Sequence, residues 1–365
     1  MEKSIDLKIK PDPDFRRLDK VLRRQGTPDR IVFYELFSNI ENEVLTALGN
    51  PNVPYSMRLE NSTPQDRILV PHITYQYYLG YDYINIREDM TGFQFPRNKR
   101  PSAMTAQGDR EYMSQDSNTI ADREDFDKYV WPVMSKIDYS YFERASEIIP
   151  EGMKAVGDSP GIFENIFWLL GYEKLAYMLY EDSELLEDMF EEVGTRVCQY
   201  FDNIASYDVV GAVRYGDDMG FKTQTLLPPD IFRKFLFPWH RKIVDLAHKH
   251  GKPIILHSCG NLDDIMEDII ETGWDAKHSF EDVIEPIWIA KGKYGSRISL
   301  LGVFDMNKLA SMSEDEVRKH TAFLIERCSP GGGWALGSGN SIPNYVPVTN
   351  LLAMLEEGYL YGKTI

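Results

Sequence analysis

The sequence predicts a (β/α)8 barrel of the TIM type, and three observations support this. From residue 150 onward, short β-rich runs alternate with helical patterns, which implies parallel strands joined by right-handed crossovers. Two further candidate strands lie upstream and bring the count to eight, in a chain of the length expected for a barrel with insertions. No Gly-x-Gly-x-x-Gly follows any predicted strand, which disfavours the competing doubly wound open sheet.

The predicted strands are short apolar runs, each followed by a polar loop. They are Ile31–Leu36, Tyr83–Ile86, Met153–Val156, Val209–Tyr215, Ile254–His257, Trp274–Ser279, Ile298–Gly302 and Trp334–Gly337. Proline in the first helical turn and glycine just past the last turn are the expected helix signals. The predicted helical segments are Phe163–Ala205, a helix opened by Pro228-Pro229-Asp230 and closed by Gly251, Leu262–Glu271 before Gly273, and Val348–Gly358.

Two segments fall outside this alternation. Residues 1–30 are polar and partly basic, and we expect an N-terminal extension whose helix caps the barrel or binds a partner. Residues 88–130 are rich in Gly, Pro, Asn, Asp and Ser, with Phe93, Phe95 and Tyr112 interspersed. An insertion after a barrel strand lies over the catalytic face, so this one is predicted to be a substrate lid; a surface decoration or a dimer arm is the alternative. We expect residues 1–365 to form a single domain.

Composition excludes several classes of partner. The 365 residues carry 40 Lys and Arg against 57 Asp and Glu, a formal net charge of −17. Nucleic acids and anionic membranes need a basic surface, so neither is an expected partner. No apolar stretch is long enough to span a bilayer, and the N-terminus has no apolar signal region. Three cysteines form no disulfide framework, so we expect a soluble cytoplasmic protein.

Barrel enzymes carry their functional residues just after the C-terminal ends of the strands. His257 and Cys259 follow one such end, and residues two apart in extended chain point to the same side and can reach one metal ion. Imidazole and thiolate together suit zinc, and Glu281, after the next strand, is the predicted third ligand. Three protein ligands with one open position indicate a catalytic site, whereas a buried cysteine acting as a small hydrophobe is the alternative.

Other strand ends carry further candidates. One of the adjacent carboxylates Asp217 and Asp218 can face the barrel mouth; we favour Asp218 as the catalytic group and Asp217 as a substrate contact, against a polar loop that caps a helix. Glu35 is a weaker catalytic candidate that could contact a cation or a hydroxyl. Substrate contacts are also predicted for the residues Ser338, Asn340 and Tyr345 near the last strand; Asp158 and Asp305 lie at the remaining strand ends.

Several motifs resemble the uroporphyrinogen decarboxylase-like superfamily, whose members are TIM barrels. The most specific is Ile255-Leu256-His257-Ser258-Cys259-Gly260-Asn261. The others are Pro28-Asp29-Arg30, Tyr215-Gly216-Asp217-Asp218, Phe237-Pro238, Leu301-Gly302-Val303-Phe304-Asp305 and Ala335-Leu336-Gly337-Ser338-Gly339-Asn340. Together they cover most of the chain.

The resemblance favours the methyltransferase branch of this superfamily over its decarboxylase branch. The decarboxylase branch has arginines after the first strand and a late histidine, whereas this chain has Phe33-Tyr34-Glu35-Leu36-Phe37-Ser38 and Ser338 there. The methyltransferase branch, related to cobalamin-independent methionine synthase, is zinc-dependent and corrinoid-linked. Its His-x-Cys and later Glu match His257, Cys259 and Glu281, but its late zinc-binding cysteine corresponds to Ser338.

The leading hypothesis is therefore a zinc-dependent methyltransferase that moves a methyl group between a small O-, N- or S-methylated substrate and a corrinoid protein or thiol. A cofactor-free decarboxylase of a smaller acid that uses Asp218 is the second hypothesis. A non-catalytic member whose site has decayed at Ser338 is the third. A homodimer is a fair expectation for a barrel with extra arms.

Overall fold

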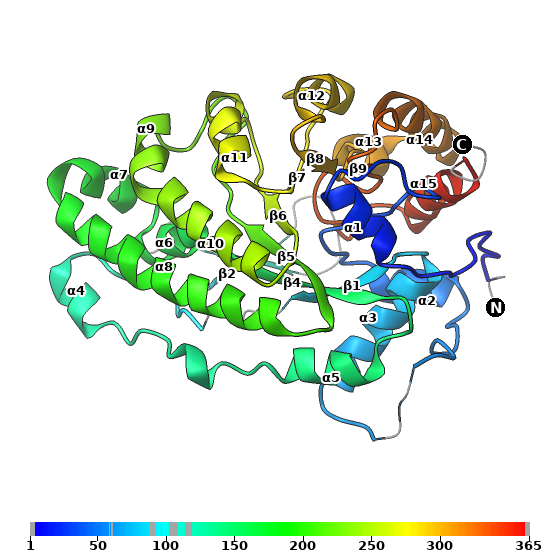
Figure 1. Cartoon of the computed structure of the whole chain (residues 1–365), viewed down its shortest axis with the longest axis horizontal. Coiled ribbons are helices and arrows are strands. Elements are labelled where there is room, and N and C mark those ends of the chain that lie inside the picture. The colour runs from blue at the N-terminus through cyan, green and yellow to red at the C-terminus, as the bar shows by residue number, and fades with distance from the viewer. Residues whose placement is uncertain are drawn as a thin grey trace.

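The computed structural model describes residues 4–57, 59, 61–87, 92–95, 97–101, 109–113 and 119–361. Seven parallel strands form one curled sheet in which the spatial order follows the chain order (Figure 1). These strands are β1 (Tyr83–Arg87), β4 (Lys154–Pro160), β5 (Val210–Gly216), β6 (Ile254–His257), β7 (Ala276–His278), β8 (Ser299–Leu301) and β9 (Trp334–Ala335). Parallel neighbours in chain order are the arrangement of a TIM-type barrel, so the predicted fold class is confirmed.

The segment predicted as the first strand, Ile31–Leu36, lies between β9 and β1 and makes a different kind of contact with each. Its backbone pairs with the chain beside β9, since Tyr34 N–H donates to the Leu336 carbonyl at 2.8 Å. Toward β1 the contacts come from side chains. The Tyr83 hydroxyl accepts from Glu35 N–H and donates to the Glu35 carbonyl, at 2.7 and 2.9 Å. The predicted strand Ile31–Leu36 thus forms a single β-bridge, between Phe33 and Leu336, rather than a full member of the ladder.

A buried ion pair crosses the interior of the barrel. Arg214 on β5 is fully buried and donates from Nε and Nη2 to Asp158 on β4, at 3.0 and 2.6 Å. Its Nη1 also donates to the Leu36 carbonyl at 2.9 Å. A buried charge requires such partners, and here they tie the first segment to the strands opposite.

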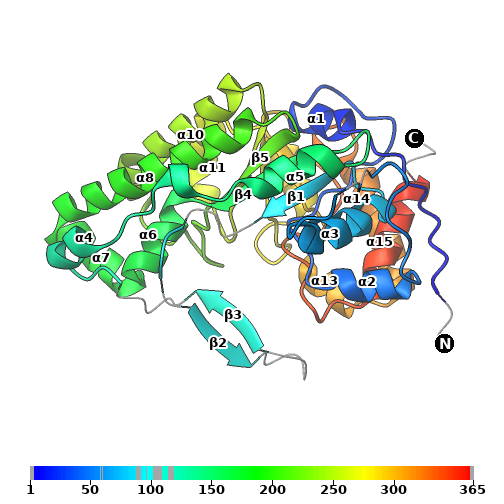
Figure 2. The same cartoon turned by 90° about the horizontal axis from the view of Figure 1, so that it is seen from below.

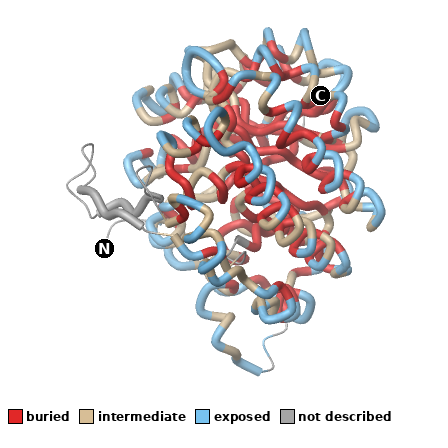
Figure 3. The backbone as a smooth tube through the Cα atoms, turned by 90° about the vertical axis from the view of Figure 1, so that its left-hand side faces the viewer, coloured by how far each residue is buried: buried red, intermediate tan, exposed pale blue. Residues whose placement is uncertain are grey.

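Helices cover the outside of the sheet, and the buried residues lie between helices and strands (Figure 3). The predicted segment Phe163–Ala205 is divided into α6 (Ile162–Leu170), α7 (Tyr172–Glu181) and α8 (Ser183–Ser206). It breaks at Gly171, which has a φ of +78°, and at Asp182, whose side chain accepts from Leu185 N–H to start α8. The described helices of the outer layer also include α2 (Glu41–Ala47), α3 (Asp66–Tyr78), α4 (Arg123–Lys128), α5 (Ser140–Ile148), α9 (Pro229–Ile231), α10 (Phe237–Lys249), α11 (Met266–Thr272), α12 (Ile287–Tyr294), α13 (Met306–Ser311), α14 (Glu314–Cys328) and α15 (Val348–Tyr361).

The N-terminal extension forms α1 (Arg16–Leu22), which lies across the N-terminal ends of the strands. The Ser299 hydroxyl at the start of β8 donates to the Val21 carbonyl at 2.7 Å. Asp82, just before β1, accepts from Arg17 Nη1 at 3.3 Å and from Arg30 Nη2 at 2.6 Å. These contacts fix α1 to the end of the barrel opposite the predicted catalytic face.

The insertion contains an antiparallel hairpin, β2 (Arg97–Pro101) with β3 (Asp109–Met113), which stands apart from the sheet in Figure 2. Before it, Phe93 packs edge-on against Trp131, and Phe95 packs against Trp168 of α6. Much of the predicted insertion, including the Tyr112 side chain, lies outside the described residues, so the lid stays a prediction. Within the described ranges, no helix combines the length and apolarity needed to cross a membrane.

Candidate metal centre

Three side chains with metal-binding atoms converge at the C-terminal ends of β5 and β6. Asp218 lies two residues after β5, His257 ends β6, and Cys259 follows two residues later. Their ligand atoms all lie within 4.8 Å of one another. His257 Nε2 is 3.5 Å from Cys259 Sγ and 3.7 Å from Asp218 Oδ1. The structure thus brings His257 and Cys259 to one side of the chain, as their spacing predicts, and adds Asp218 to them.

Two glycines allow the loops after β5 and β6 to pack closely around this group. Gly260 has a φ of +84°, and a Cβ there would lie 2.3 Å from the carbonyl carbon of Gly220. A Cβ on Gly220 would in turn lie 2.7 Å from the Cys259 carbonyl oxygen. The close approach lets Cys259 N–H donate to Asp218 Oδ1 at 2.8 Å. This hydrogen bond holds the carboxylate beside the thiol and the imidazole.

A second histidine, His278 at the end of β7, sets the tautomer of His257. His278 Nε2 lies 3.0 Å from the Ser338 carbonyl oxygen, and because a carbonyl only accepts, this nitrogen carries a hydrogen. Burial, together with the nearby cations of Arg214 and Lys277, lowers the pKa of His278 to about 3, so the ring is neutral and Nδ1 accepts. His257 Nδ1, 2.8 Å away, therefore donates to it. The lone pair of His257 Nε2 then faces Cys259 and Asp218 and can bind a metal ion.

The surroundings of Cys259 also fit a metal ligand. Burial and the Asp218 carboxylate raise the pKa of this thiol well above its ordinary value, whereas Asn340 Nδ2 lies 3.3 Å from Sγ and can donate to it. A bound cation reverses the balance, because coordination deprotonates a thiol outright. One nitrogen, one sulfur and one carboxylate oxygen form a donor set that zinc accepts, with a fourth position left for substrate or water.

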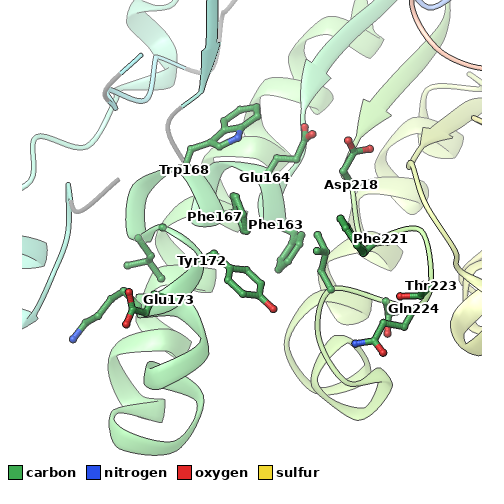
Figure 4. Close-up of a pocket in the computed structure, with 16 residues that line it drawn as sticks. Phe163, Glu164, Phe167, Trp168, Tyr172, Glu173, Asp218, Phe221, Thr223 and Gln224 are labelled. Carbon is green, nitrogen blue, oxygen red and sulfur yellow. The ribbon is translucent and has the colours of Figure 1, made fainter. Parts of the chain in front are cut away.

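The group opens on a pocket of about 800 Å³, of which Asp218 forms part of the wall (Figure 4). The Glu164 and Asp218 carboxylates lie toward the same end of the pocket. The described lining residues come from α6, the start of α7 and the loop after β5: Phe163, Glu164, Phe167, Trp168, Leu170, Gly171, Tyr172, Glu173, Lys174, Asp218, Gly220, Phe221, Thr223, Gln224, Thr225 and Leu226.

Asp217 lies at the N-terminus of α6. It is fully buried, and its carboxylate accepts from Glu164 N–H at 2.8 Å, from Phe163 N–H at 3.3 Å and from the Tyr215 hydroxyl at 2.8 Å. His240 Nε2 lies 2.9 Å from Oδ2. These partners occupy both oxygens, so Asp217 caps the N-terminus of α6, which is the alternative named for this loop; its substrate contact stays a prediction.

Ser338 and Glu35 contact each other rather than the pocket. Ser338 is fully buried and Glu35 nearly so, and the Ser338 hydroxyl is hydrogen-bonded to both Glu35 and the Asn340 carbonyl. Burial raises the pKa of Glu35 to about 8. One hydroxyl proton cannot serve two acceptors, so a protonated Glu35 donates to Ser338, which donates to Asn340. Ser338 therefore links the first and last segments of the barrel, and its predicted substrate contact stays a prediction.

Two other predicted residues lie beside the site. Glu281, three residues after β7, lines a small cavity together with Lys277 and Gly260 and is not part of the three-residue ligand group found among the described residues. Its role as a ligand stays a prediction, because the structure brings Asp218 to that position. Tyr345, in the loop before α15, is 36% exposed and is not among the described residues that line the pocket.

Comparison with known proteins identifies the family of the chain. The family model "Uroporphyrinogen decarboxylase (URO-D)" matches residues 117–359, about two thirds of the chain. The chain belongs to the uroporphyrinogen decarboxylase family. A methyltransferase from Methanosarcina mazei has a similar structure, with a TM-score of 0.73 at 15% identity over 96% of this chain and 99% of that chain. A xylanase B from Clostridium stercorarium aligns with a TM-score of 0.38 at 10% identity, over 61% of this chain and 85% of that chain. No curated protein sequence matches.

Sequence reasoning missed three features of this family member. His278 was not singled out, although the β6–β7 register pairs His257 with His278 and would reveal two neighbouring histidines. Lys277, buried beside the centre with its pKa lowered to about 8 by burial, was also missed. The aromatic side chains of α6 that line the pocket follow a helical pattern and cannot be told from core residues by spacing alone.

Proposed function

We propose that this member of the uroporphyrinogen decarboxylase family is a zinc-dependent methyltransferase. It would move a methyl group between a small O-, N- or S-methylated substrate and a corrinoid protein or thiol. The observation that carries the proposal is the group of Asp218, His257 and Cys259, in which Asp218 also lines a pocket large enough for a small molecule. The likeness to a methyltransferase from Methanosarcina mazei supports the choice of reaction class.

Asp218, His257 and Cys259 would hold the ion, which when bound supplies a Lewis acid that stabilises a leaving heteroatom or lowers the pKa of a thiol. His278 keeps the Nε2 lone pair of His257 directed at the ion through its hydrogen bond to Nδ1. Asn340 donates to the Cys259 sulfur and favours its thiolate form. The aromatic rings that line the pocket supply apolar surface for a methyl group next to Asp218.

The decarboxylase alternative is less well supported by the pocket. A carboxylate substrate needs a cationic partner when it leaves water. Among the described lining residues, three carry a carboxylate, namely Glu164, Glu173 and Asp218, against the one cation Lys174. Such a lining repels an acid.

The test is metal analysis of the protein as purified, with matched cysteine variants. We expect about one zinc per chain, and most of it lost in Cys259→Ser. Cys198→Ser is the control, because Cys198 lies on α8 away from the ligand group. Transfer of the methyl group from methylcobalamin to a thiol, followed by the cobalamin absorbance, then tests the reaction. Equal zinc in Cys259→Ser and the parent would refute the metal centre; a zinc-loaded protein with no methyl transfer to or from any corrinoid would refute the reaction.

A further inference from the structure

The pocket beside the ligand group presents aromatic rings from three separate elements. Phe163, Phe167 and Trp168 belong to α6, Tyr172 begins α7, and Phe221 lies in the loop after β5 (Figure 4). The residues Tyr172 and Phe221 are 48% and 61% exposed, although they are large aromatic side chains. Aromatic rings that remain exposed around a cavity indicate a surface prepared for a ligand.

Carboxylates accompany these rings. Glu164, Glu173 and Asp218 line the pocket, against the single cation Lys174 among the described lining residues. The Glu164 carboxylate lies over the end of β5, where Oε2 would be 3.6 Å from a Cβ on Gly216. A pocket that served only a neutral aromatic ligand would have no use for these charges, and an anionic ligand would be repelled by them.

The N-terminus of α6 lies at this pocket, and by itself it would favour an anion. Asp217 removes that preference, because it accepts from the N–H groups of Phe163 and Glu164, while the first N–H of the helix, that of Ile162, donates to the Tyr215 hydroxyl. The positive end of the helix is therefore satisfied from within the protein. What remains facing the pocket is the negative charge of the carboxylates and the electron-rich faces of the rings.

We propose that the pocket binds a methylated ammonium group, so that the methyl compound handled by this protein is a tertiary or quaternary methylammonium compound. The proposal rests on the proposed methyl transfer and names its substrate class. Aromatic faces attract such cations through their quadrupoles and accept the methyl groups as apolar surface. A divalent ion held by the Asp218 carboxylate and the Cys259 thiolate would offset both negative charges, and Glu164 and Glu173 of the pocket lining then supply the negative charge for the ammonium.

In the proposed reaction the methyl group passes from the ammonium nitrogen to a nucleophilic acceptor, which is a thiolate or a reduced corrinoid. The acceptor supplies the electron pair of the new bond to the methyl carbon. The electron pair of the broken carbon–nitrogen bond stays on nitrogen, so a quaternary ammonium leaves as a neutral tertiary amine. No external oxidant or reductant is consumed in this step.

The test compares the binding of two probes of equal shape, choline and its uncharged analogue 3,3-dimethyl-1-butanol. Titration is followed by calorimetry and by tryptophan fluorescence, to which Trp168 in the pocket wall contributes, in protein as purified and after treatment with a chelator. We expect choline to bind at least about tenfold more tightly than the alcohol. Glu164→Gln should weaken choline binding about tenfold and leave binding of the alcohol unchanged. Glu181→Gln is the matched control, because Glu181 is an exposed carboxylate at the end of α7 and does not line the pocket.

Trp168→Leu is a second variant, which removes an aromatic ring of the pocket and keeps the Glu164 carboxylate. It should weaken choline binding several-fold while the circular dichroism spectrum stays that of the parent. Equal affinity for both probes, or unchanged choline binding in Glu164→Gln, would overturn the proposal. Because choline binding is measured without turnover, its failure is distinct from a failure of zinc binding or methyl transfer, which the metal and cobalamin assays report.

Discussion

The two ends of the barrel use their carboxylates in opposite ways. At the N-terminal end, Asp82 is buried and accepts from Arg17, from Arg30 and from Asp14 N–H. At the C-terminal end, Asp218 is 40% exposed at its side chain and lies beside an imidazole and a thiol. The first carboxylate is neutralised by the protein itself. The second lies next to an imidazole and a thiol, and the three groups together can bind a cation.

This difference separates stability from function. Charges that cancel within the fold contribute to its free energy of unfolding, and removal of one leaves the others buried and unpaired. Asp218 receives one hydrogen bond from the protein, from Cys259 N–H, and its side chain is partly exposed, so its removal should affect ligand binding more than folding. In barrels of this type the C-terminal end of the sheet is the functional one. Four substitutions test this division, from the largest expected effect to the smallest.

Asp82→Ala should have the largest effect. It leaves Arg30, whose other partners are the carbonyls of Ile31 and Gly80, buried without a counter-charge. We expect the free energy of unfolding to fall by about 3–5 kcal/mol in urea titration, with the zinc content of the folded fraction unchanged. Asp82→Asn should cost less, because its oxygen still accepts from both arginines. A loss below about 1 kcal/mol in the alanine variant would mean that solvent already screens this pair.

Glu35→Gln should stabilise the protein in a way that depends on pH. Glu35 is protonated in the folded state up to its pKa of about 8, whereas the unfolded chain loses this proton near 4.5. Between these values the folded state binds more protons, so the parent loses stability as pH rises, by up to about 1.4 kcal/mol per pH unit. Glutamine reproduces the neutral form, with an amide that donates to Ser338. The stability gain of the variant should therefore be near zero at pH 4.5 and largest at pH 8; a gain that does not change with pH would contradict the buried neutral carboxyl.

His278→Phe should weaken the metal centre without removing a ligand. Without the acceptor at His278, the Nδ1 hydrogen of His257 loses its partner, and the tautomer that frees Nε2 is no longer selected. Loss of such an outer partner typically costs 10–100-fold in metal affinity, about 1.4–2.7 kcal/mol. Competition with a chromophoric chelator measures the change. His320→Phe is the control, because His320 packs against Phe323 on α14 away from the centre; equal affinities in the two variants would refute the positioning role.

The sequence allowed the fold class and the strand positions to be predicted, because strands and helices have different hydrophobic periods and each carries its own stop signals. The first segment, Ile31–Leu36, was predicted as a full strand, and its single bridge could not be foreseen. Its other partners are side chains of β1, and hydrogen bonds between side chain and backbone leave no periodic trace in the sequence.

The candidate site was predicted in part, for similar reasons. The His257–Cys259 spacing is local, so it can be recognised in the sequence alone, and both residues belong to the ligand group. The choice between Asp218 and Glu281 depends on how two loops pack, which Gly220 and Gly260 decide through close backbone contact. The role of Asp217 depends on the N-terminus of α6, more than fifty residues earlier in the chain. Contacts of this range are set by the tertiary fold and not by spacing.

Asp218→Asn should have the smallest effect on stability. It is most informative when it is compared with Asp217→Asn. The asparagine oxygen at position 218 can still accept from Cys259 N–H, so we expect the metal-free protein to change by less than about 0.5 kcal/mol. The loss of an anionic ligand should nevertheless lower zinc affinity at least about tenfold. At position 217 both carboxylate oxygens accept from buried donors, and an amide nitrogen cannot, so the neighbouring change should cost about 1–3 kcal/mol. Urea titration and chelator competition on both variants decide the matter. If Asp218→Asn costs as much stability as Asp217→Asn and leaves zinc affinity intact, Asp218 supports the fold, and the division between the two ends of the barrel does not hold at β5.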